Sequence, residues 1–387
     1  MNPKVFIKKG KEKSLQRRHP WVFSGAIYGV SETLKDGALV DVVDAQETHW
    51  GTGYFSDRGS ITVRMLTFQN ETFTPHFWAD KLKAAWQVRQ EFIDFEHTNA
   101  FRVIHGEGDG IPGLIIDFYN NHWVIQAHST GVFERLNDVA QAIETLFPDQ
   151  CTTIYCKSKG TLGQTGTDYF IKGDAAETIA KENDIAFKVN WVEGQKTGFF
   201  LDQRDNRQLL SKYAKGKKVL NTFCYTGGFS VYAAKAGATL VTSVDISQKA
   251  VDLATENMLH NFPNAMHEAV ADDVFDFMRT HDQLYNVIVL DPPAFAKNIK
   301  NKHTATQAYK RLNLAGLKAL APQGILFTFS CSQVIDDVLF YNTVAAAAIE
   351  SGRSIRVLHK LNQGPDHPTN IYHPEGHYLK GLVLFVE

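Results

Sequence analysis

The sequence predicts an α/β protein with three parts: a small β-barrel, a small α+β domain and a doubly wound parallel sheet. With 387 residues, the chain is too long for one ordinary hydrophobic core. Short β-rich runs fill its beginning, and from about residue 191 apolar strands alternate strictly with helices. The predicted domains are therefore residues 1–70, 71–190 and 191–387.

The predicted barrel comprises short strands that glycines and Asp or Asn residues separate. The β-rich runs are 5–7, 38–43, 50–55 and 61–66. This spacing of short strands and turns is typical of a small barrel. After Pro75, apolar residues at three-and-four spacing predict a helix over 77–95.

The middle of the chain predicts a small α+β layer. Strands over 101–105 and 114–118 flank a turn-rich segment, and a strand over 123–127 follows Asn120-Asn121, a hairpin signal. A helix over 133–146 leads to a strand over 153–156. The middle of the chain is therefore predicted to have the pattern strand, strand, helix, strand, strand.

The last part contains near-continuous apolar strands, which indicate a parallel sheet covered on both faces. We expect Ser247 to open the helix after the second of them. The strands are expected at 219–223, 240–245, 287–291 and 325–329.

Composition excludes several classes of protein. No apolar run approaches the roughly 18 residues that span a bilayer, and the N-terminus lacks the apolar core of a signal peptide. The four cysteines have no paired spacing, which argues against a disulfide framework and a metal site. We therefore expect a cytoplasmic protein that binds no metal. The net charge of −2 does not indicate nucleic-acid binding, but basic residues are concentrated in residues 1–18.

Polar features follow four strands of the predicted sheet, where doubly wound sheets bind their ligands. They are the turn 221–230 with Gly227-Gly228, Asp245, the pair Asp272-Asp273, and Asp291-Pro292-Pro293. Each has a simpler interpretation, because the turn can be a tight βα connection and an acid can cap a helix. In this order they resemble the S-adenosylmethionine-binding motifs of class I methyltransferases.

Cys331 follows the strand at 325–329, so it is expected in the same crevice as Asp291. A buried core cysteine is the alternative interpretation. Carbon-5 of a pyrimidine needs activation by a thiolate that adds to carbon-6, and a carboxylate near N3 stabilises the adduct for cytosine. We therefore predict Cys331 as nucleophile and Asp291 as that carboxylate. Amino-group methylation is disfavoured because Ala294 stands where those enzymes carry an aromatic residue.

From end to end, the chain resembles the RlmI-like large-subunit rRNA methyltransferases, which make 5-methylcytosine. The resemblance lies in the segments 17–25, which is similar to the start of a PUA domain, 106–114, 196–204, 291–293, 329–332, 367–368 and 375–381. It implies a Rossmann-like class I methyltransferase sheet, S-adenosylmethionine as cofactor, an rRNA cytosine as substrate and often a homodimer.

The motifs and the resemblance together predict two sets of binding residues. The cofactor is expected to contact Phe199, Asp202, Asn221, Phe223, Tyr225, Thr226, Gly227, Ser230, Asp245, Asp273, Asp291 and Pro292. RNA is expected to contact Lys8, Lys9, Arg17, Arg18, His19 and Trp21. The alternatives are that Phe199 is a core residue, that Asp202 only caps a helix, and that the basic residues form an ordinary solvated face around a core aromatic.

Other functions stay open at this point. The enzyme could modify another RNA base, as 5-methyluridine or on an exocyclic amine. A non-catalytic RNA-binding ribosome-assembly factor would keep the fold but lose the cofactor motifs. An oxidoreductase could use the parallel sheet for NAD, which preferential binding of NAD would reveal.

Overall fold

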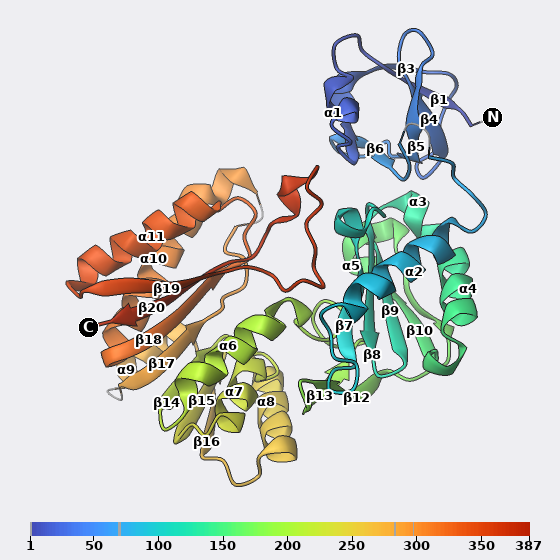
Figure 1. Ribbon diagram of the computed structural model, residues 1–387. Helices are drawn as coiled ribbons and strands as arrows, with labels where there is room; N and C mark the ends of the chain where they lie inside the picture. Colours follow the sequence, from blue (N-terminus) through green and yellow to red (C-terminus); the bar gives the residue numbers. More distant parts are fainter. Residues whose placement is uncertain (1, 69–70, 282–283, 297) are drawn as a thin grey trace. The chain divides into compact units, whose positions relative to one another are not determined.

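The computed structural model describes residues 2–68, 71–281, 284–296 and 298–387 (Figure 1). The chain divides into two compact units, each made of several chain segments. The first comprises Met1–Asp184, Val189–Leu201 and Pro365–Gly376, and the second comprises Ile185–Lys188, Asp202–Gly364 and His377–Glu387.

The first unit begins with a six-stranded sheet in the order β2-β6-β5-β4-β1-β3. Its buried side chains, such as Val5, Val40 and Val63, form a separate small core. The predicted strands are confirmed, whereas β2 and β3 were missed because both are short and lie close together in the sequence. The elements are β1 (Lys4–Ile7), α1 (Lys13–Gln16), β2 (Trp21–Phe23), β3 (Ile27–Val30), β4 (Leu39–Val43), β5 (His49–Phe55) and β6 (Ile61–Met65).

A five-stranded sheet in the order β11-β10-β9-β8-β7 follows. The elements are α2 (Phe77–Gln90), β7 (Ala100–His105), β8 (Leu114–Tyr119), β9 (His122–Ala127), α3 (Thr130–Phe133), α4 (Leu136–Leu146), β10 (Thr153–Lys157), α5 (Lys159–Leu162) and β11 (Asp168–Lys172). The hairpin is confirmed, since Asn120 and Asn121 adopt φ of 46° and 68° between β8 and β9. A two-stranded sheet of β12 (Glu177–Glu182) and β13 (Ile185–Asn190) comes next.

Two predicted helices differ from the observed ones. Helix α2 ends at Gln90 rather than residue 95, and the Asp94 carboxylate instead accepts a hydrogen bond from the Glu96 N–H at 3.0 Å, which favours a turn. The predicted helix over 133–146 is two helices, α3 and α4.

The segment 365–376 belongs to the first unit although it lies near the end of the chain. The guanidinium of Arg89 is completely buried, pairs with Asp109 at 2.5 Å and donates to the Asp366 carbonyl at 2.8 Å. The Arg102 N–H donates to the Asp366 carboxylate at 3.1 Å. This late segment therefore completes the polar core of the first unit.

The second unit is the predicted doubly wound α/β domain. Its seven-stranded sheet has the order β16-β15-β14-β17-β18-β20-β19. Strands β14 to β18 are parallel, and β20 pairs antiparallel with both β18 and β19. The strands are β14 (Lys218–Thr222), β15 (Leu240–Asp245), β16 (His267–Ala271), β17 (Tyr285–Leu290), β18 (Leu320–Ser330), β19 (Ile355–Leu361) and β20 (Lys380–Val386).

Two groups of helices accompany this sheet (Figure 1). One group comprises α6 (Arg204–Ala214), α7 (Gly228–Lys235) and α8 (Gln248–Asn261), and the other comprises α9 (Val274–Thr280), α10 (Lys302–Ala319) and α11 (Asp337–Ser351). Ser247 caps α8 by accepting a hydrogen bond from the Ala250 N–H at 3.3 Å, as predicted. The strand order reverses between β14 and β17, and this switch point is where such folds bind ligands.

Candidate active site

The polar strand ends of the second unit meet along one edge of its sheet. Thr222 at the end of β14 pairs with Val244 on β15 and with Leu290 on β17, and Leu290 pairs with Thr328 on β18. Because these strands are parallel, the residues that follow them emerge at the same edge. The register therefore brings together the turn after β14 and the ends of β15, β17 and β18.

The turn after β14 has an unusual backbone. Phe223, Tyr225 and Gly227 have φ of 53°, 46° and 77°. A Cβ atom on Gly227 would lie 2.9 Å from the Cβ of Ala254, so a side chain cannot fit there. Left-handed residues other than glycine are strained and cluster at ligand sites, which favours the predicted role of this turn.

Asp245, at the end of β15, fixes the turn. One carboxylate oxygen accepts a hydrogen bond from the Tyr225 N–H, and the other accepts from the Ser247 N–H, each at 3.0 Å. The carboxylate is therefore held at the strand ends beside the turn. Contact with the cofactor ribose stays a prediction.

Asp273 has the capping role that the sequence left as an alternative. Its carboxylate accepts hydrogen bonds from the N–H groups of Phe275 and Asp276, at the first turn of α9. Asp272 in turn accepts from the Asp273 N–H at 2.8 Å. The predicted adenine contact would have to coexist with this cap.

Two residues predicted to bind the cofactor lie inside the domain. The Asn221 amide donates to Ser230 Oγ at 2.9 Å, and Ser230 Oγ lies 2.6 Å from Ser243 Oγ. Ser243 Oγ lies 2.8 Å from His267 Nε2, and burial lowers the pKa of His267 to about 4. Asn221 and Ser230 are almost fully buried, so this chain of hydrogen bonds supports the turn from beneath.

Three further predicted cofactor residues differ in their surroundings. Thr226 is buried, and its carbonyl accepts a hydrogen bond from the Asn257 amide at 2.9 Å. Asp202 is buried and accepts from the Tyr378 hydroxyl at 2.7 Å. Phe199 is buried and belongs to the first unit, so its cofactor contact stays a prediction.

Asp291 follows β17 directly and is only partly buried. Its carboxylate accepts a hydrogen bond from the side-chain amide of Gln203 at 3.0 Å, and Gln203 is itself held by the Asn206 amide at 2.7 Å. The sequence analysis missed Gln203, although it lies within the segment 196–204 that carried the resemblance. Gln203 orients the carboxylate that we predicted to act on the substrate.

Cys331 differs from the other cysteines. All four are described by the structure, and Cys331 alone is partly exposed. Its Sγ lies 4.0 Å from the carbonyl oxygen of Pro292, so it stands beside Asp291-Pro292 as predicted. Burial raises the pKa of the Cys224 thiol and raises that of Cys156 to about 11, which makes both poor nucleophiles at neutral pH.

A buried lysine lies beside this cysteine. The Lys380 ammonium donates hydrogen bonds to the carbonyls of Ser332 at 2.8 Å and Tyr378 at 2.6 Å. Desolvation lowers the pKa of Lys380, and the negative charges of Asp337, Cys331 and Asp336 oppose that shift. Lys380 lies within the segment 375–381 that carried the resemblance, but only the pairing of β20 with β18 brings it beside Cys331.

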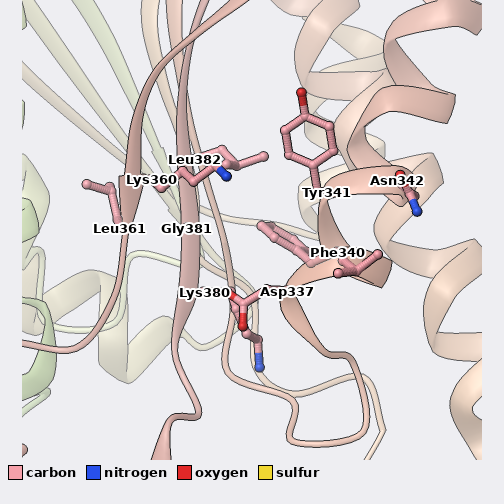
Figure 2. A pocket seen from close by; sticks show the side chains of 10 residues that line it. Asp337, Phe340, Tyr341, Asn342, Lys360, Leu361, Lys380, Gly381 and Leu382 are labelled. Carbon is pink, nitrogen blue, oxygen red and sulfur yellow. The ribbon is translucent and has the colours of Figure 1, made fainter.

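A cavity of about 290 Å³ lies between α11 and the strands β19 and β20 (Figure 2). Lys380 lies at one end of it, near Asp337, and Tyr341 and Lys360 line it further on. Ser330 pairs with Lys380, and Gly381 pairs with Leu361. The cavity is therefore adjacent to the strand end that carries Cys331.

The predicted RNA-binding residues are mostly exposed, as an RNA contact requires. Lys8, Lys9, Arg17 and Arg18 are exposed, whereas His19 and Trp21 are partly buried. The Trp21 indole donates to the Glu107 carboxylate at 2.7 Å, and its ring centre lies 4.3 Å from that of His373. Trp21 is thus packed within the first unit rather than presented as a free stacking surface.

The strand-end residues suit S-adenosylmethionine, because a doubly wound sheet binds nucleosides at its switch point. A carboxylate at Asp245 matches the ribose hydroxyls, and the strained turn lets backbone groups approach the ligand closely. In the described part of the chain, no helix is long and apolar enough to cross a membrane. The described residues include one potential metal-binding group, Asp94, Glu96 and His97, and all three are exposed.

Comparison with known proteins defines the class. A family model described as a PUA-like domain matches residues 5–68, and one described as an S-adenosylmethionine-dependent methyltransferase matches residues 164–382. The fold resembles that of a protein assigned as a SAM-dependent methyltransferase from Streptococcus mutans, with a TM-score of 0.85 and 24% identity over 99% of this chain and 100% of that one. A methyltransferase complexed with SAH gives a TM-score of 0.86 at the same identity and coverage.

Curated relatives match along the whole chain. A ribosomal RNA large subunit methyltransferase I from Pseudoalteromonas atlantica is 38% identical and covers 100% of both chains. A protein of the same name from Aeromonas hydrophila is 39% identical over 99% of each chain. This chain therefore belongs to the family of S-adenosylmethionine-dependent methyltransferases that includes these relatives, which confirms the predicted fold class and cofactor and excludes the NAD oxidoreductase.

Proposed function

We propose that this protein methylates carbon-5 of a cytosine in large-subunit ribosomal RNA, with Cys331 as the nucleophile. The names of the full-length relatives support the RNA. The position of Cys331 carries the proposed chemistry: it is the one partly exposed cysteine, and its Sγ lies 4.0 Å from the Pro292 carbonyl beside Asp291.

S-adenosylmethionine supplies an electrophilic methyl group when it is bound. The Cys331 thiolate adds to carbon-6 of the cytosine, forming a C–S bond and making carbon-5 nucleophilic. Carbon-5 then forms a bond to the methyl group, and the bond between that methyl group and the sulfonium sulfur breaks. A general base removes the carbon-5 proton, the double bond re-forms, and the C–S bond breaks to release the thiolate.

The surrounding residues prepare this step. Asp291, which accepts a hydrogen bond from Gln203, is proposed to contact the N3 side of the ring and stabilise the adduct. The Lys380 ammonium fixes the backbone at Ser332, next to the nucleophile. Asp245, Asp202 and Asp273 are proposed to hold the cofactor, together with the strained turn.

Trapping of the covalent adduct tests the proposal. RNA in which 5-fluorocytidine replaces cytidine has no carbon-5 proton to lose, so the protein should form a stable adduct that denaturing electrophoresis resolves. We expect no adduct for Cys331→Ala and an undiminished one for Cys151→Ala, which removes a buried cysteine. An adduct that persists in Cys331→Ala would remove this residue from the mechanism.

The same assay separates the alternative bases. An adduct with 5-fluorouridine RNA alone would indicate 5-methyluridine as the product. Methyl transfer without an adduct on either RNA would indicate an exocyclic amine. Mapping of methylated pyrimidines in rRNA from a deletion strain would then identify the nucleotide.

We also propose the division into three domains at about residues 70 and 190, a cytoplasmic location and a homodimer. Action on ribosomal RNA is compatible with that location. Light scattering of the purified protein tests the dimer: a mass near 43.4 kDa would contradict it.

A further inference from the structure

Arg64 is a half-buried cation with no partner among the described residues. It lies on β6, where its neighbour across the β2–β6 pair is Trp21. Within the described part of the chain, its guanidinium makes no hydrogen bond or ion pair, and desolvation lowers its pKa. A partly desolvated guanidinium with five unused donors is unfavourable unless a ligand accepts from it.

Two carboxylates act on Arg64 without pairing with it. Glu107 and Asp36 act on Arg64 only electrostatically. The Glu107 carboxylate accepts from the Trp21 indole at 2.7 Å, and Asp36 accepts from the Thr130 hydroxyl at 2.6 Å. Asp36 Oδ1 has no hydrogen-bond partner among the described residues, so the two acids lower the positive charge of the site without pairing with the guanidinium.

A buried hydroxyl points to the same place. Ser129 is 7% exposed, and its Oγ has no hydrogen-bond partner within the part of the chain that the structure describes. A Cβ atom built on Gly113 would lie 3.2 Å from Ser129 Oγ and 3.6 Å from Arg64 Cδ. The two side chains thus converge over a glycine, and an unpartnered hydroxyl beside an unpartnered guanidinium offers two kinds of donor to one acceptor.

The positive charge of Arg64 also acts on His128, the residue before Ser129. His128 remains accessible to solvent, yet desolvation lowers its pKa to about 4, and the charges of Arg102 and Arg64 add to the effect. Its Nε2 lies 3.2 Å from Gln126 Oε1. Arg102 is compensated by Asp117 at 2.7 Å, so Arg64 is the cation that lacks a direct counter-charge.

We propose that Arg64 and Ser129 form a binding site for a phosphate group of the RNA strand. A guanidinium presents a fork of donors that matches two phosphate oxygens, and the hydroxyl can donate to a third. The site deepens the proposed function, on which the identification of the phosphate as RNA rests. Arg64 and Ser129 lie outside the basic segment 1–18, and neither is among the six residues predicted from the sequence to contact RNA.

Equilibrium binding tests the site. The affinity of the full-length protein for a transcript of large-subunit rRNA is measured over a range of salt concentrations. We expect Arg64→Gln to weaken binding about tenfold and to lower the salt slope by about one, and Ser129→Ala to weaken it about threefold. Arg279→Gln, which removes a highly exposed arginine from α9, is the charge-matched control and should change neither quantity.

Arg64→Lys separates a ligand site from a structural charge. It keeps the charge without the fork, so binding should weaken while the salt slope is retained. If Arg64→Gln does not fold, the affinity of Arg64→Lys for RNA still tests the site. Unchanged RNA affinity in a folded Arg64→Gln or Arg64→Lys variant would overturn the proposal. Competition by inorganic phosphate at millimolar concentration without any effect of the variants on RNA binding would also overturn it, because the site would then serve a free anion.

The outcome is independent of the methylation chemistry. At saturating RNA, Arg64→Gln should still form the Cys331 adduct. If the wild-type protein forms no adduct but Arg64→Gln binds RNA more weakly, the proposed function is overturned and the phosphate site is supported. If the wild-type protein forms the adduct but the Arg64 variants bind RNA as tightly as the wild type, the phosphate site is overturned and the proposed function is supported.

Discussion

Lys380 donates a hydrogen bond from its ammonium to the carbonyl of Ser332 at 2.8 Å, one residue after Cys331. The lysine is 3% exposed. It therefore holds the chain immediately beyond the proposed nucleophile and places a positive charge near the thiol.

Replacing this lysine should lower the reactivity of the cysteine. A nearby ammonium stabilises a thiolate, so Lys380→Met should slow alkylation of Cys331 by iodoacetamide about tenfold at neutral pH. Mass spectrometry of the alkylated peptide measures the rate for Cys331 alone. Lys360→Met, in the same cavity, is the control. Equal alkylation rates in Lys380→Met and the wild type would mean that the lysine only supports the backbone.

Asp245→Asn should weaken cofactor binding. The change keeps the shape of the side chain but removes the charge that accepts from Tyr225 and Ser247 and that we expect at the ribose. Calorimetry should show affinity for S-adenosylmethionine reduced about tenfold or more. Asp252→Asn, on the exposed face of α8, should have no effect. Unchanged affinity in Asp245→Asn would rule out the ribose contact.

Asp273 allows capping to be separated from cofactor binding. Asp273→Ala removes two hydrogen bonds at the start of α9 and should destabilise the protein by about 1 kcal/mol. Asp273→Ser can still cap the helix, so chemical denaturation should show near wild-type stability. If Asp273→Ser also retains full cofactor affinity, the adenine contact predicted from the sequence is wrong.

His267 should make stability depend on pH. Its folded-state pKa of about 4 lies below the usual 6.5, so the unfolded state binds more protons between these values. The stabilisation is complete above about pH 6.5 and is lost as the pH falls towards 4. Because the ring is partly exposed, we expect a loss of about 1–2 kcal/mol. His267→Asn should reduce the slope of this part of the profile in thermal unfolding, and His128, whose pKa is also lowered to about 4, accounts for part of the slope that remains. A slope equal to that of the wild type would contradict this assignment.

The sequence predicted those parts of the fold that depend on local pattern. Alternating apolar strands and helices located β14, β15, β17 and β18, and Ser247 and the Asn120-Asn121 hairpin behaved as their residue types suggest. The position of Cys331 beside Pro292 followed from the common edge of parallel strands. These inferences needed only short stretches of sequence.

The remaining features depend on pairings between distant segments. Nothing near Lys380 in the sequence indicates that β20 will carry it to the end of β18. Gln203 reaches Asp291 across 88 residues of sequence. Asn221 and Ser230 were predicted from their residue types to contact the cofactor. In the structure, their side chains instead form a hydrogen bond with each other beneath the turn. Polar residue types alone do not distinguish a ligand contact from a buried support.

The return of residues 365–376 to the first unit has a consequence for how this protein can evolve. These residues supply the Asp366 groups that satisfy Arg89 and Arg102, yet they are encoded between β19 and β20 of the methyltransferase sheet. A single recombination breakpoint therefore cannot exchange either unit for a foreign one without removing residues from the other. The two units must be inherited together, and a chimaera would have to carry this late segment along with the N-terminal part.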